Sequence, residues 1–372
     1  MGETPRVLVL NERDPEHPKA GGAEVHVSEI FRRLADRGWD VSLAATSFPG
    51  CETEAVVDGI RVLRLGRTRF YYPRAARTCA VDTRRGRYDV VVECLNKLPY
   101  YSPVYSAVPV VAVAHHLFGT SAFMQVPWPV AATVWTAERL IPLLYRNIPF
   151  VSISESTRDD LVQRGIRRDL VEVQHCGIRR PSVAFDAFAE REFRVVYTGR
   201  LERYKQIDVL LRAMARLSDR FPNARIDIVG RGNDRNRLEK IAQQEGIANR
   251  THFAGFVSDD ERDRLLAAAR ACVCPSAKEG WGLTVIEANA LGTPVIATDA
   301  PGLRDSVDEG RTGFLVPDGD VGAFAEHIER LFTDAALGSR LSRNGLEWSR
   351  RFDWDLAADR MAQTLEAARR RP

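Results

Sequence analysis

The sequence of 372 residues contains no apolar run that approaches the ~20 residues needed to cross a membrane. It starts almost directly with a strand-like segment at residues 7–10, and the pattern of a secretory signal peptide is missing. The formal net charge is only +3, so overall charge does not indicate a nucleic-acid-binding protein. From these absences we expect a cytoplasmic protein.

The sequence also lacks the usual patterns of metal and dinucleotide sites. Its six cysteines show neither Cys-x-x-Cys spacing nor histidines at the distance of a zinc motif, which predicts reduced and mostly buried thiols. An Asp-x-Asp-like metal cluster has no convincing place. The Gly-x-Gly-x-x-Gly fingerprint is missing, and this argues against an ordinary dinucleotide-dependent dehydrogenase. We therefore expect no metal ion and no other cofactor.

Short apolar runs alternate with helical patterns along the whole chain. This alternation is typical of α/β proteins with parallel sheets built from strand–helix–strand units. The length fits two domains, and a hydrophobic content of 45% is enough for a sizeable core in each. The irregular stretch 179–192 separates two such series of runs, so we predict Rossmann-like domains at residues 1–185 and 186–353.

The most informative stretch extends from Glu279 to Glu287. It connects a strand-like run, residues 271–275, to a helical segment. Gly280 and Gly282 allow a ligand to approach the backbone, and the first amides of a helix favour a phosphate. Glu279 could accept hydrogen bonds from sugar hydroxyls. Glu287 lies five residues after Gly282, or about 7.5 Å along a helix, and could reach a ribose diol. The alternative is a capping loop with two surface glutamates.

Two cations flank another predicted strand-to-helix turn. Arg200 follows the run 193–196, and Lys205 precedes a helical pattern that begins at residue 206. A guanidinium group can bind phosphate oxygens in a bidentate manner, and an ammonium group can act as a point charge beside them. The pattern predicts a diphosphate site, with surface decoration as the alternative.

Ligand-binding signals also occur in the first predicted domain. Gly21 and Gly22 open a helix just after the first strand, which suits backbone contact with a ligand at the carboxyl edge of a parallel sheet. His115 and His116 follow the strand-like run 110–114, and a histidine there can donate or accept a proton near neutral pH. A histidine bonded within its own loop is the alternative.

Two further segments suggest a surface for an acceptor. Residues 61–87 hold nine arginines and one acid, Asp82, which indicates either a solvated face or a patch for an anionic acceptor or anionic lipid headgroups. Residues 128–146 predict an apolar helix that packs in the core or contacts a membrane surface. No nucleic-acid-binding motif accompanies the arginines. The candidate patch consists of Arg69, Tyr71, Tyr72, Arg74 and Arg77.

The run EGWGLTVIE at residues 279–287 resembles the retaining, sugar-nucleotide-dependent enzymes of glycosyltransferase family 4 (glycosyl transferases group 1). Gly-Gly-Ala-Glu at 21–24 and Gly-Arg-Leu at 199–201, followed by Lys205, are similar to further motifs of that family. The resemblance implies the GT-B fold, in which two Rossmann-like domains face each other across a cleft. It also implies that the last helix, within 354–372, returns to the first, acceptor-binding domain, while the second domain binds the nucleotide sugar.

The resemblance assigns roles to individual residues. His115 and Glu279 would be catalytic, with His115 at the place of the family's histidine and His116 at the place of its aspartate. Phe256 and Val257 would lie beside the base. The remaining assignments are Arg200, Lys205, Gly21, Gly22, Gly282 and Leu283 for the donor diphosphate, and Glu279, Gly280, Trp281 and Glu287 for the donor sugar and ribose.

The implied reaction is metal-independent transfer of a hexosyl unit, with retention, from a nucleoside diphosphate sugar to an acceptor hydroxyl. A UDP-sugar is the favoured donor, and the acceptor would be a glycan, a lipid-linked molecule or a small molecule, with no nucleic acid involved. Peripheral contact with an anionic membrane, at its inner face, is left open. The alternatives are a GT-B sugar-nucleotide epimerase and a catalytically silent subunit that binds a sugar nucleotide.

Overall fold

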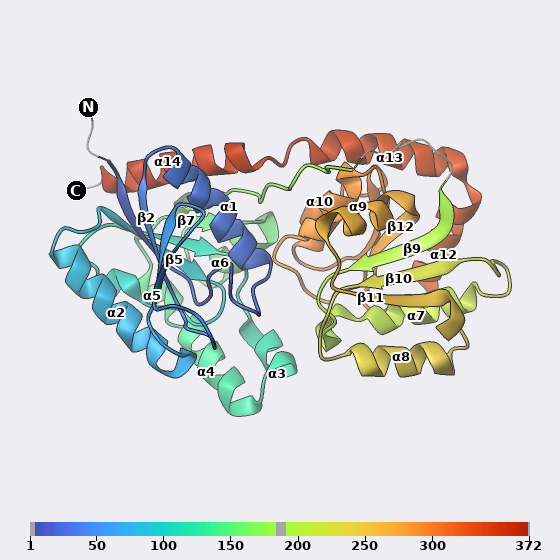
Figure 1. Cartoon of the computed structure of the whole chain (residues 1–372), viewed down its shortest axis with the longest axis horizontal. Helices are drawn as coiled ribbons and strands as arrows, with labels where there is room; N and C mark the ends of the chain where they lie inside the picture. Colours follow the sequence, from blue (N-terminus) through green and yellow to red (C-terminus); the bar gives the residue numbers. More distant parts are fainter. Residues whose placement is uncertain (1–3, 184–190, 371–372) are drawn as a thin grey trace. The chain divides into compact units, whose positions relative to one another are not determined.

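The structure, a computed structural model, describes residues 4–183 and 191–370 and divides into two compact units. Unit 1 comprises Met1–Gly177 and Asp353–Pro372, and unit 2 comprises Ile178–Phe352. Each unit contains one sheet with helices packed on it (Figure 1). The two series of strand–helix–strand units predicted from the sequence therefore correspond to two separate sheets.

The sheet of unit 1 has eight strands in the order β3-β4-β2-β1-β5-β6-β7-β8. All neighbours pair in parallel except β3 and β4, which form an antiparallel edge. Because helices cover both faces of a parallel sheet, its central strands are apolar on both sides. The strands are β1 Arg6–Leu10, β2 Asp40–Ala45, β3 Glu54–Val57, β4 Ile60–Arg64, β5 Val90–Leu95, β6 Val110–Ala114, β7 Phe150–Ser152 and β8 Val171–Val173.

Two long helices pack together within unit 1 although they lie at opposite ends of the chain. The last helix, α14 (Trp354–Arg369), contacts α1 (Gly22–Asp36) and strands β5 and β6. Arg33 of α1 forms an ion pair of 2.7 Å with Asp355 of α14. The predicted return of the C-terminal helix to the first domain is confirmed.

Helix α2 (Thr68–Arg84) packs in a separate core cluster of unit 1. Its residues Tyr71, Ala75 and Cys79 lie against Leu8 and Leu10 of β1. The shorter helices are α3 Ala122–Gln125, α4 Trp128–Glu138, α5 Ile141–Leu144 and α6 Glu155–Gln163. Ser154 caps α6 by accepting a hydrogen bond from the amide of Thr157.

The predicted helix over residues 128–146 is two helices, α4 and α5, and the interpretation as a core element is only partly correct, because Ile141 and Tyr145 belong to a core cluster but several other apolar side chains are exposed. Of its predicted apolar positions, Ile141 is buried, whereas Leu140 and Leu143 are 43% and 64% exposed. Trp128, at the start of α4, is 72% exposed. Apolar composition without a clear one-sided pattern could not show which side chains would meet the core.

The sheet of unit 2 has six strands, all parallel, in the order β11-β10-β9-β12-β13-β14. Its main core cluster lies between the sheet and α7, α8 and α12, and α9 and α10 also contact the sheet. The strands are β9 Glu192–Thr198, β10 Arg225–Val229, β11 Thr251–Gly255, β12 Ala269–Cys274, β13 Val295–Thr298 and β14 Gly313–Val316. The helices are α7 Ile207–Arg216, α8 Arg235–Gln244, α9 Asp259–Ala268, α10 Leu283–Ala290, α11 Leu303–Ser306, α12 Val321–Thr333 and α13 Ala335–Ser349.

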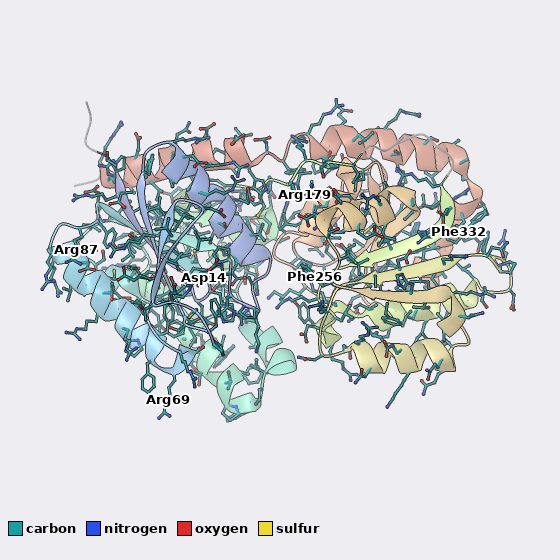
Figure 2. All side chains as sticks on the ribbon, viewed as in Figure 1. Asp14, Arg69, Arg87, Arg179, Phe256 and Phe332 are labelled. Carbon is teal, nitrogen blue, oxygen red and sulfur yellow. The ribbon has the colours of Figure 1, made fainter. Side chains whose placement is uncertain are left out.

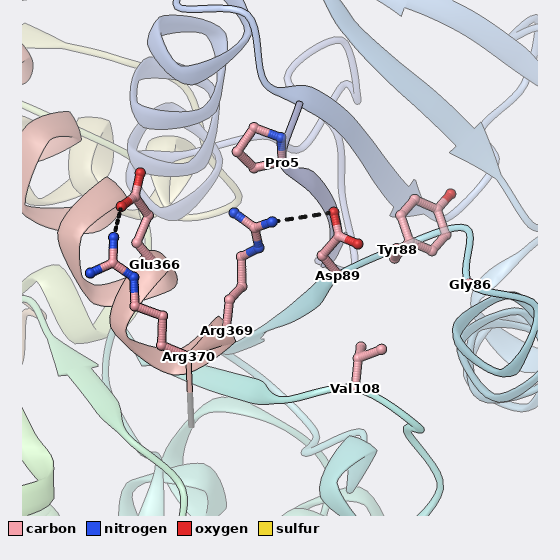
Figure 3. Close-up of a pocket in the computed structure, with 8 residues that line it drawn as sticks. All are labelled: Pro5, Gly86, Tyr88, Asp89, Val108, Glu366, Arg369 and Arg370. Carbon is pink, nitrogen blue, oxygen red and sulfur yellow. Dashed lines mark hydrogen bonds and ion pairs between the residues drawn. The ribbon is translucent and has the colours of Figure 1, made fainter. Parts of the chain in front are cut away.

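Two cavities of about 590 and 510 Å³ lie in unit 1 beside α14. The larger is lined by Pro5, Asp89 and Val108, each just before a strand of the sheet, and by Arg369 of α14 (Figure 3). In a parallel α/β sheet, ligands bind at the carboxyl ends of the strands, so this is the opposite edge. None of the predicted site residues lines either cavity.

Across residues 4–183 and 191–370, no helix is both long enough and apolar enough to span a bilayer.

Candidate functional site

In unit 2, the loops that follow β9 and β10 lie in direct backbone contact. The amide of Leu201 donates to the carbonyl of Arg231 at 2.9 Å. A Cβ atom on Gly230 would lie 1.8 Å from the carbonyl oxygen of Gly199, and Gly230 has a φ of +136°. A side chain at position 230 would therefore separate the two loops. This contact fixes the backbone from which Arg200 and Lys205 project.

Lys205 and Glu279 form an ion pair that joins the loop after β9 to the loop after β12. The side chains are 12% and 21% exposed. Burial opposes the charged ammonium group, but the Glu279 carboxylate outweighs it, so the pKa of Lys205 is raised. The amide of Ala277 also donates to the carbonyl of Tyr204 at 3.0 Å, and the sequence-predicted cation and carboxylate thus lie together.

Arg200 lies beside the same loop on the exposed side. Its Nη2 donates to the hydroxyl of Tyr204 at 3.0 Å, and the Tyr204 ring centroid lies 5.2 Å from the Lys205 ammonium nitrogen. Arg200 is exposed. Tyr204 therefore contacts both predicted diphosphate ligands.

Helix α10 begins at Leu283, directly after Gly282 in the left-handed conformation with φ of +88°. A Cβ atom on Gly282 would lie 2.8 Å from Ser306 Oγ. The first amides of α10 therefore directly follow the loop after β12, which carries Glu279, the partner of Lys205. One turn later, Glu287 lies 3.7 Å from Arg262 of α9, and burial raises the pKa of Glu287 against the opposing charge of Arg262.

Two aromatic residues of the predicted donor site differ sharply in exposure. Trp281 is 2% exposed and packs on Phe352, so its ring belongs to the core, and its place in the donor-sugar site stays a prediction. Phe256, after β11, is 74% exposed (labelled in Figure 2), and Val257 is half-buried. The guanidinium carbon of Arg231 lies 5.4 Å from the Phe256 ring centroid. Phe256 therefore offers a free aromatic face with a cation beside it.

In unit 1, Gly21 and Gly22 stand at the start of α1, next to the carboxylate of Glu24. The amide of Gly21 donates to Glu24 Oε2 at 2.7 Å. Burial raises the pKa of Glu24, and the hydrogen bond from Gly21 opposes that shift. The Glu24 carboxylate thus satisfies the amide of the residue before the helix, which is one half of the arrangement that caps many helices; Gly21 has no side chain to supply the other half.

The ends of three adjacent strands in unit 1 carry polar side chains. Glu12 follows β1 and accepts a hydrogen bond of 3.0 Å from Tyr72, and Lys97, after β5, forms an ion pair with Glu12. Burial lowers the pKa of Lys97, and the charge of Glu12 opposes that change. The third strand end, after β6, carries His115.

His115 is 2% exposed and its Nε2 lies 3.1 Å from Nδ1 of His26 on α1. The outer nitrogens of this pair, His115 Nδ1 and His26 Nε2, are buried and have no hydrogen-bond partner within the described part of the chain. Burial lowers the pKa of His26 to about 4, and burial with the two neighbouring histidines lowers that of His115. His116 is partly exposed, and its ring contacts Phe118.

The predicted basic and aromatic patch on α2 is only partly correct. Arg69, Arg74 and Arg77 are exposed, whereas Tyr71 is fully buried and donates hydrogen bonds to the carbonyls of Asn11 and Ala44. Its ring faces the sheet because it lies on the apolar side of the helix. Figure 2 labels Arg69 at one end of α2 and Arg87 just beyond the other. The exposed patch is therefore a row of arginines without Tyr71.

Sequence reasoning missed three residues that lie beside the predicted ones. His26 gives no local signal, because only the fold places α1 beside β6. Arg231 had a local signal, because it is a cation between two glycines, Gly230 and Gly232, directly after a predicted strand. Glu138 had a stronger one as the single acid in the apolar segment 128–146; it is 1% exposed and binds the backbone of the loop that carries His115 and His116.

The cysteines are mostly buried, as predicted, with Cys51 the partly exposed one among the six. No group of three or more His, Cys, Asp or Glu side chains within residues 4–183 and 191–370 is arranged to hold a metal ion.

Two family models match the chain, one in each half. "Glycosyltransferase Family 4" matches residues 20–180, and "Glycosyl transferases group 1" matches residues 181–348. A D-inositol 3-phosphate glycosyltransferase of Streptomyces bingchenggensis is 29% identical, over 100% of this chain and 91% of that protein.

Solved structures match along nearly the whole chain. A sucrose-phosphate synthase of Thermosynechococcus elongatus has a TM-score of 0.82 at 25% identity and covers 98% of each chain. HepE of Anabaena, solved in complex with UDP and glucose, has a TM-score of 0.78 at 21% identity, over 97% of this chain and 99% of that one. The predicted GT-B fold, with two Rossmann-like sheets and a returning C-terminal helix, is confirmed.

The buried imidazole pair predicts acid sensitivity of unit 1. Between pH 6.5 and about 4 the unfolded chain binds a proton at His26 that the folded protein excludes, so the free energy of unfolding falls as the pH falls. His26 alone contributes up to about 3 kcal/mol over this window. The free energy of unfolding is measured by urea titration at pH 7, 6 and 5, and the opening of α1 by hydrogen exchange of its peptides. Both should depend less steeply on pH in His26→Phe than in the wild type.

The matched control is His252→Gln, at an exposed histidine of unit 2, which should leave the pH dependence of α1 unchanged. Parallel curves for the wild type and His26→Phe would show that the pair does not set the acid sensitivity.

Proposed function

Because the chain belongs to glycosyltransferase family 4, a family of retaining enzymes, we propose that it transfers a hexosyl unit from a UDP-sugar to an acceptor hydroxyl. The observation that carries the proposal is the Lys205–Glu279 ion pair beside the start of α10, with Arg200 next to it. Two cations and a helix N-terminus at the carboxyl edge of one sheet suit a diphosphate. The choice of UDP is supported by the HepE complex with UDP and glucose.

In the proposed reaction, the bond between the sugar C1 and the β-phosphate oxygen breaks, and UDP leaves. Arg200, Lys205 and the first amides of α10 stabilise the charge that develops on the diphosphate. The acceptor hydroxyl forms the new C1–O bond on the same face of the sugar, and its proton passes to the departing phosphate oxygen. These groups provide the charge stabilisation directly, so the proposed reaction needs no metal ion.

The proposed donor contacts follow the positions of the remaining side chains. When the diphosphate binds, Lys205 pairs with the phosphates and Glu279 accepts hydrogen bonds from the sugar hydroxyls in place of Lys205. Glu287 accepts hydrogen bonds from the ribose. The backbone at Gly280, Gly282 and Leu283 lies against the phosphates. Phe256, with Val257 beside it, contacts the base through its exposed ring.

For the first domain we propose contacts with the sugar and the acceptor. Nδ1 of His115 is buried and has no hydrogen-bond partner among the described residues, and we propose that a sugar hydroxyl becomes its partner when the donor binds. The partly exposed His116 lies next to it. The backbone at Gly21 and Gly22 lies beside the donor phosphates and the acceptor in this proposal, and the Gly21 amide exchanges Glu24 for the ligand. The name of the Streptomyces relative indicates a phosphorylated cyclitol as its acceptor, and a small anionic acceptor, a glycan and a lipid-linked molecule are the classes to be tested here.

We further propose that unit 1 contacts an anionic membrane surface. Arg69, Arg74 and Arg77 are exposed on α2, and Asp82 is the one acid of that helix. The loop after β5 contacts both α4 and α2. The hydroxyl of Tyr101 donates to the carbonyl of Ala137 in α4, and the ring of Tyr100 packs on Tyr72 in α2. The segment that includes α3, α4 and α5 exposes six large apolar side chains: Phe123, Val126, Trp128, Val130, Leu140 and Leu143. Basic and apolar groups together suit the interface of an anionic bilayer.

The proposed activity predicts release of UDP that depends on an acceptor. The protein is incubated with a panel of nucleotide sugars, alone and with glycan, cyclitol phosphate or lipid-linked acceptors, and the products are identified by mass spectrometry. The expected result is a glycosylated acceptor plus UDP, with full activity in excess EDTA. Conversion of the donor without any acceptor would indicate an epimerase, and binding without turnover would indicate a silent subunit. Loss of activity in EDTA, with rescue by Mg²⁺ or Mn²⁺, would contradict the metal-free mechanism.

The ion pair predicts opposite effects of two substitutions on UDP affinity, measured by calorimetry. Lys205→Ala removes a charge-assisted contact of about 1.5–3 kcal/mol, so UDP should bind roughly 10- to 150-fold more weakly. Glu279→Gln removes the carboxylate that competes with the diphosphate, which should strengthen UDP binding by about 1 kcal/mol, or about fivefold.

Lys240→Ala, at an exposed position of α8, is the charge-matched control and should leave the affinity unchanged. Unaltered binding by Lys205→Ala would exclude its contact with the diphosphate.

The arginine row predicts salt-sensitive binding to vesicles. Replacing Arg74, Arg77 and Arg84 with serine should weaken binding to phosphatidylglycerol-containing vesicles about 100-fold, at about 1 kcal/mol for each cation near the surface. Sedimentation with neutral and anionic vesicles measures the effect.

The control replaces three exposed arginines of unit 2 with serine, so it has the same net charge as the test variant. Its binding to anionic vesicles should stay close to that of the wild type; the three positions are Arg340, Arg343 and Arg350. Equal loss in both variants would assign the attraction to overall charge, and no loss would leave α2 as a solvated face.

A further inference from the structure

Glu138 is the buried carboxylate at the end of α4, and its two oxygens bind two successive backbone amides. Oε1 accepts from the amide of Phe118 at 2.6 Å, and Oε2 accepts from the amide of Gly119 at 2.7 Å. Both amides belong to the loop between β6 and α3, which begins with His115 and His116. A carboxylate that accepts two backbone N–H bonds makes stronger contacts than a neutral acceptor.

A cation completes this arrangement. Arg164, just after α6, donates from Nη1 to Glu138 Oε2 at 3.1 Å and from Nε to Asp160 at 2.9 Å. Gly119 has a φ of +54°, and a Cβ atom there would lie 2.9 Å from Arg164 Nη2. The space beside the loop is thus filled by the guanidinium group, which neutralises the buried Glu138 and holds it in place.

The remaining anchors of the loop lie at its start. The carbonyl of His115 accepts a weak bond from the hydroxyl of Thr157 at 3.4 Å, and Leu117 packs in the core with Ile141 and Tyr145. After Leu117, the backbone amides of two successive residues, Phe118 and Gly119, both donate to Glu138. The carboxylate therefore controls where the loop turns after the two histidines.

We propose that Glu138 is a positioning residue for sugar transfer: it fixes the turn after His115 and His116, and so sets the direction of the imidazole groups towards the donor sugar and the acceptor. Glu138 itself touches neither substrate. This inference rests on the proposed function for the role of the histidines, whereas the clamp on the loop is a property of unit 1 alone.

The test compares Glu138→Gln with Asp160→Asn. Glu138→Gln keeps the size of the side chain but has one acceptor oxygen for two amides, so the turn should shift. Asp160→Asn removes the other acidic partner of Arg164 and leaves both amide bonds intact, which makes it the matched control. Gly119→Ala disturbs the same turn from the loop side and provides a second variant if Glu138→Gln does not fold.

Two measurements are made on the full-length protein. In steady-state transfer, Glu138→Gln and Gly119→Ala should lower kcat about 10- to 100-fold, because a displacement of about 1 Å can cost that much. The affinity for UDP, which unit 2 binds in our proposal, should stay within about twofold. In spectra of protein labelled at the histidine rings, the signals of His115 and His116 should move, while those of His252 and His327 in unit 2 should not.

Asp160→Asn should match the wild type in both measurements. Glu138→Gln with the transfer rate and ring signals of Asp160→Asn would overturn the proposal. So would equal losses of kcat, UDP affinity and thermal stability in Glu138→Gln, because that pattern indicates a purely structural role. A wild-type protein that transfers no sugar would contradict the proposed function, and the movement of the ring signals would still decide whether Glu138 holds the loop.

Discussion

A largely buried ammonium group requires a negative partner, and in unit 2 this requirement connects Lys205 to Glu279, 74 residues further along the chain. Lys205 obtains its partner from Glu279, and the contact joins the carboxyl ends of β9 and β12, which are neighbours in the sheet. The ammonium group of Lys205 stays positively charged with either the Glu279 carboxylate or a phosphate group as its partner. A diphosphate can therefore replace the carboxylate without creating an unpaired buried charge, and the same residue can hold the empty site together and bind the ligand.

The backbone around this pair is held by close packing. Gly230 allows the loop after β10 to lie against the loop after β9, and Gly282 allows α10 to start beside Ser306. Both positions combine a positive φ with a contact that a Cβ atom would disrupt. The charged side chains thus extend from rigid turns, and rigidity lowers the cost of arranging them around a ligand.

The sequence predicted the features that depend on neighbours along the chain. Glycines before a helix, cations after a strand and the alternation of apolar runs indicated the parallel sheets and the loops that carry Arg200, Lys205 and Glu279. It did not predict the direction of side chains such as Tyr71, which was expected in an exposed patch and is buried, or Trp281, whose ring packs in the core. Their direction depends on which side of a helix or loop meets the core, and that is decided by distant segments. His115 shows the same limit, because its partner His26 lies 89 residues away.

The order of segments in unit 1 has a consequence for synthesis of the protein. Unit 2 is a single continuous piece, Ile178–Phe352, whereas unit 1 needs Asp353–Pro372 to complete it. On the ribosome, all of unit 2 therefore emerges before α14, the helix that packs on α1, β5 and β6. The domain made first is the last to finish, and until α14 has emerged the surface that it covers, which includes His26 beside Trp354, remains open to chaperones.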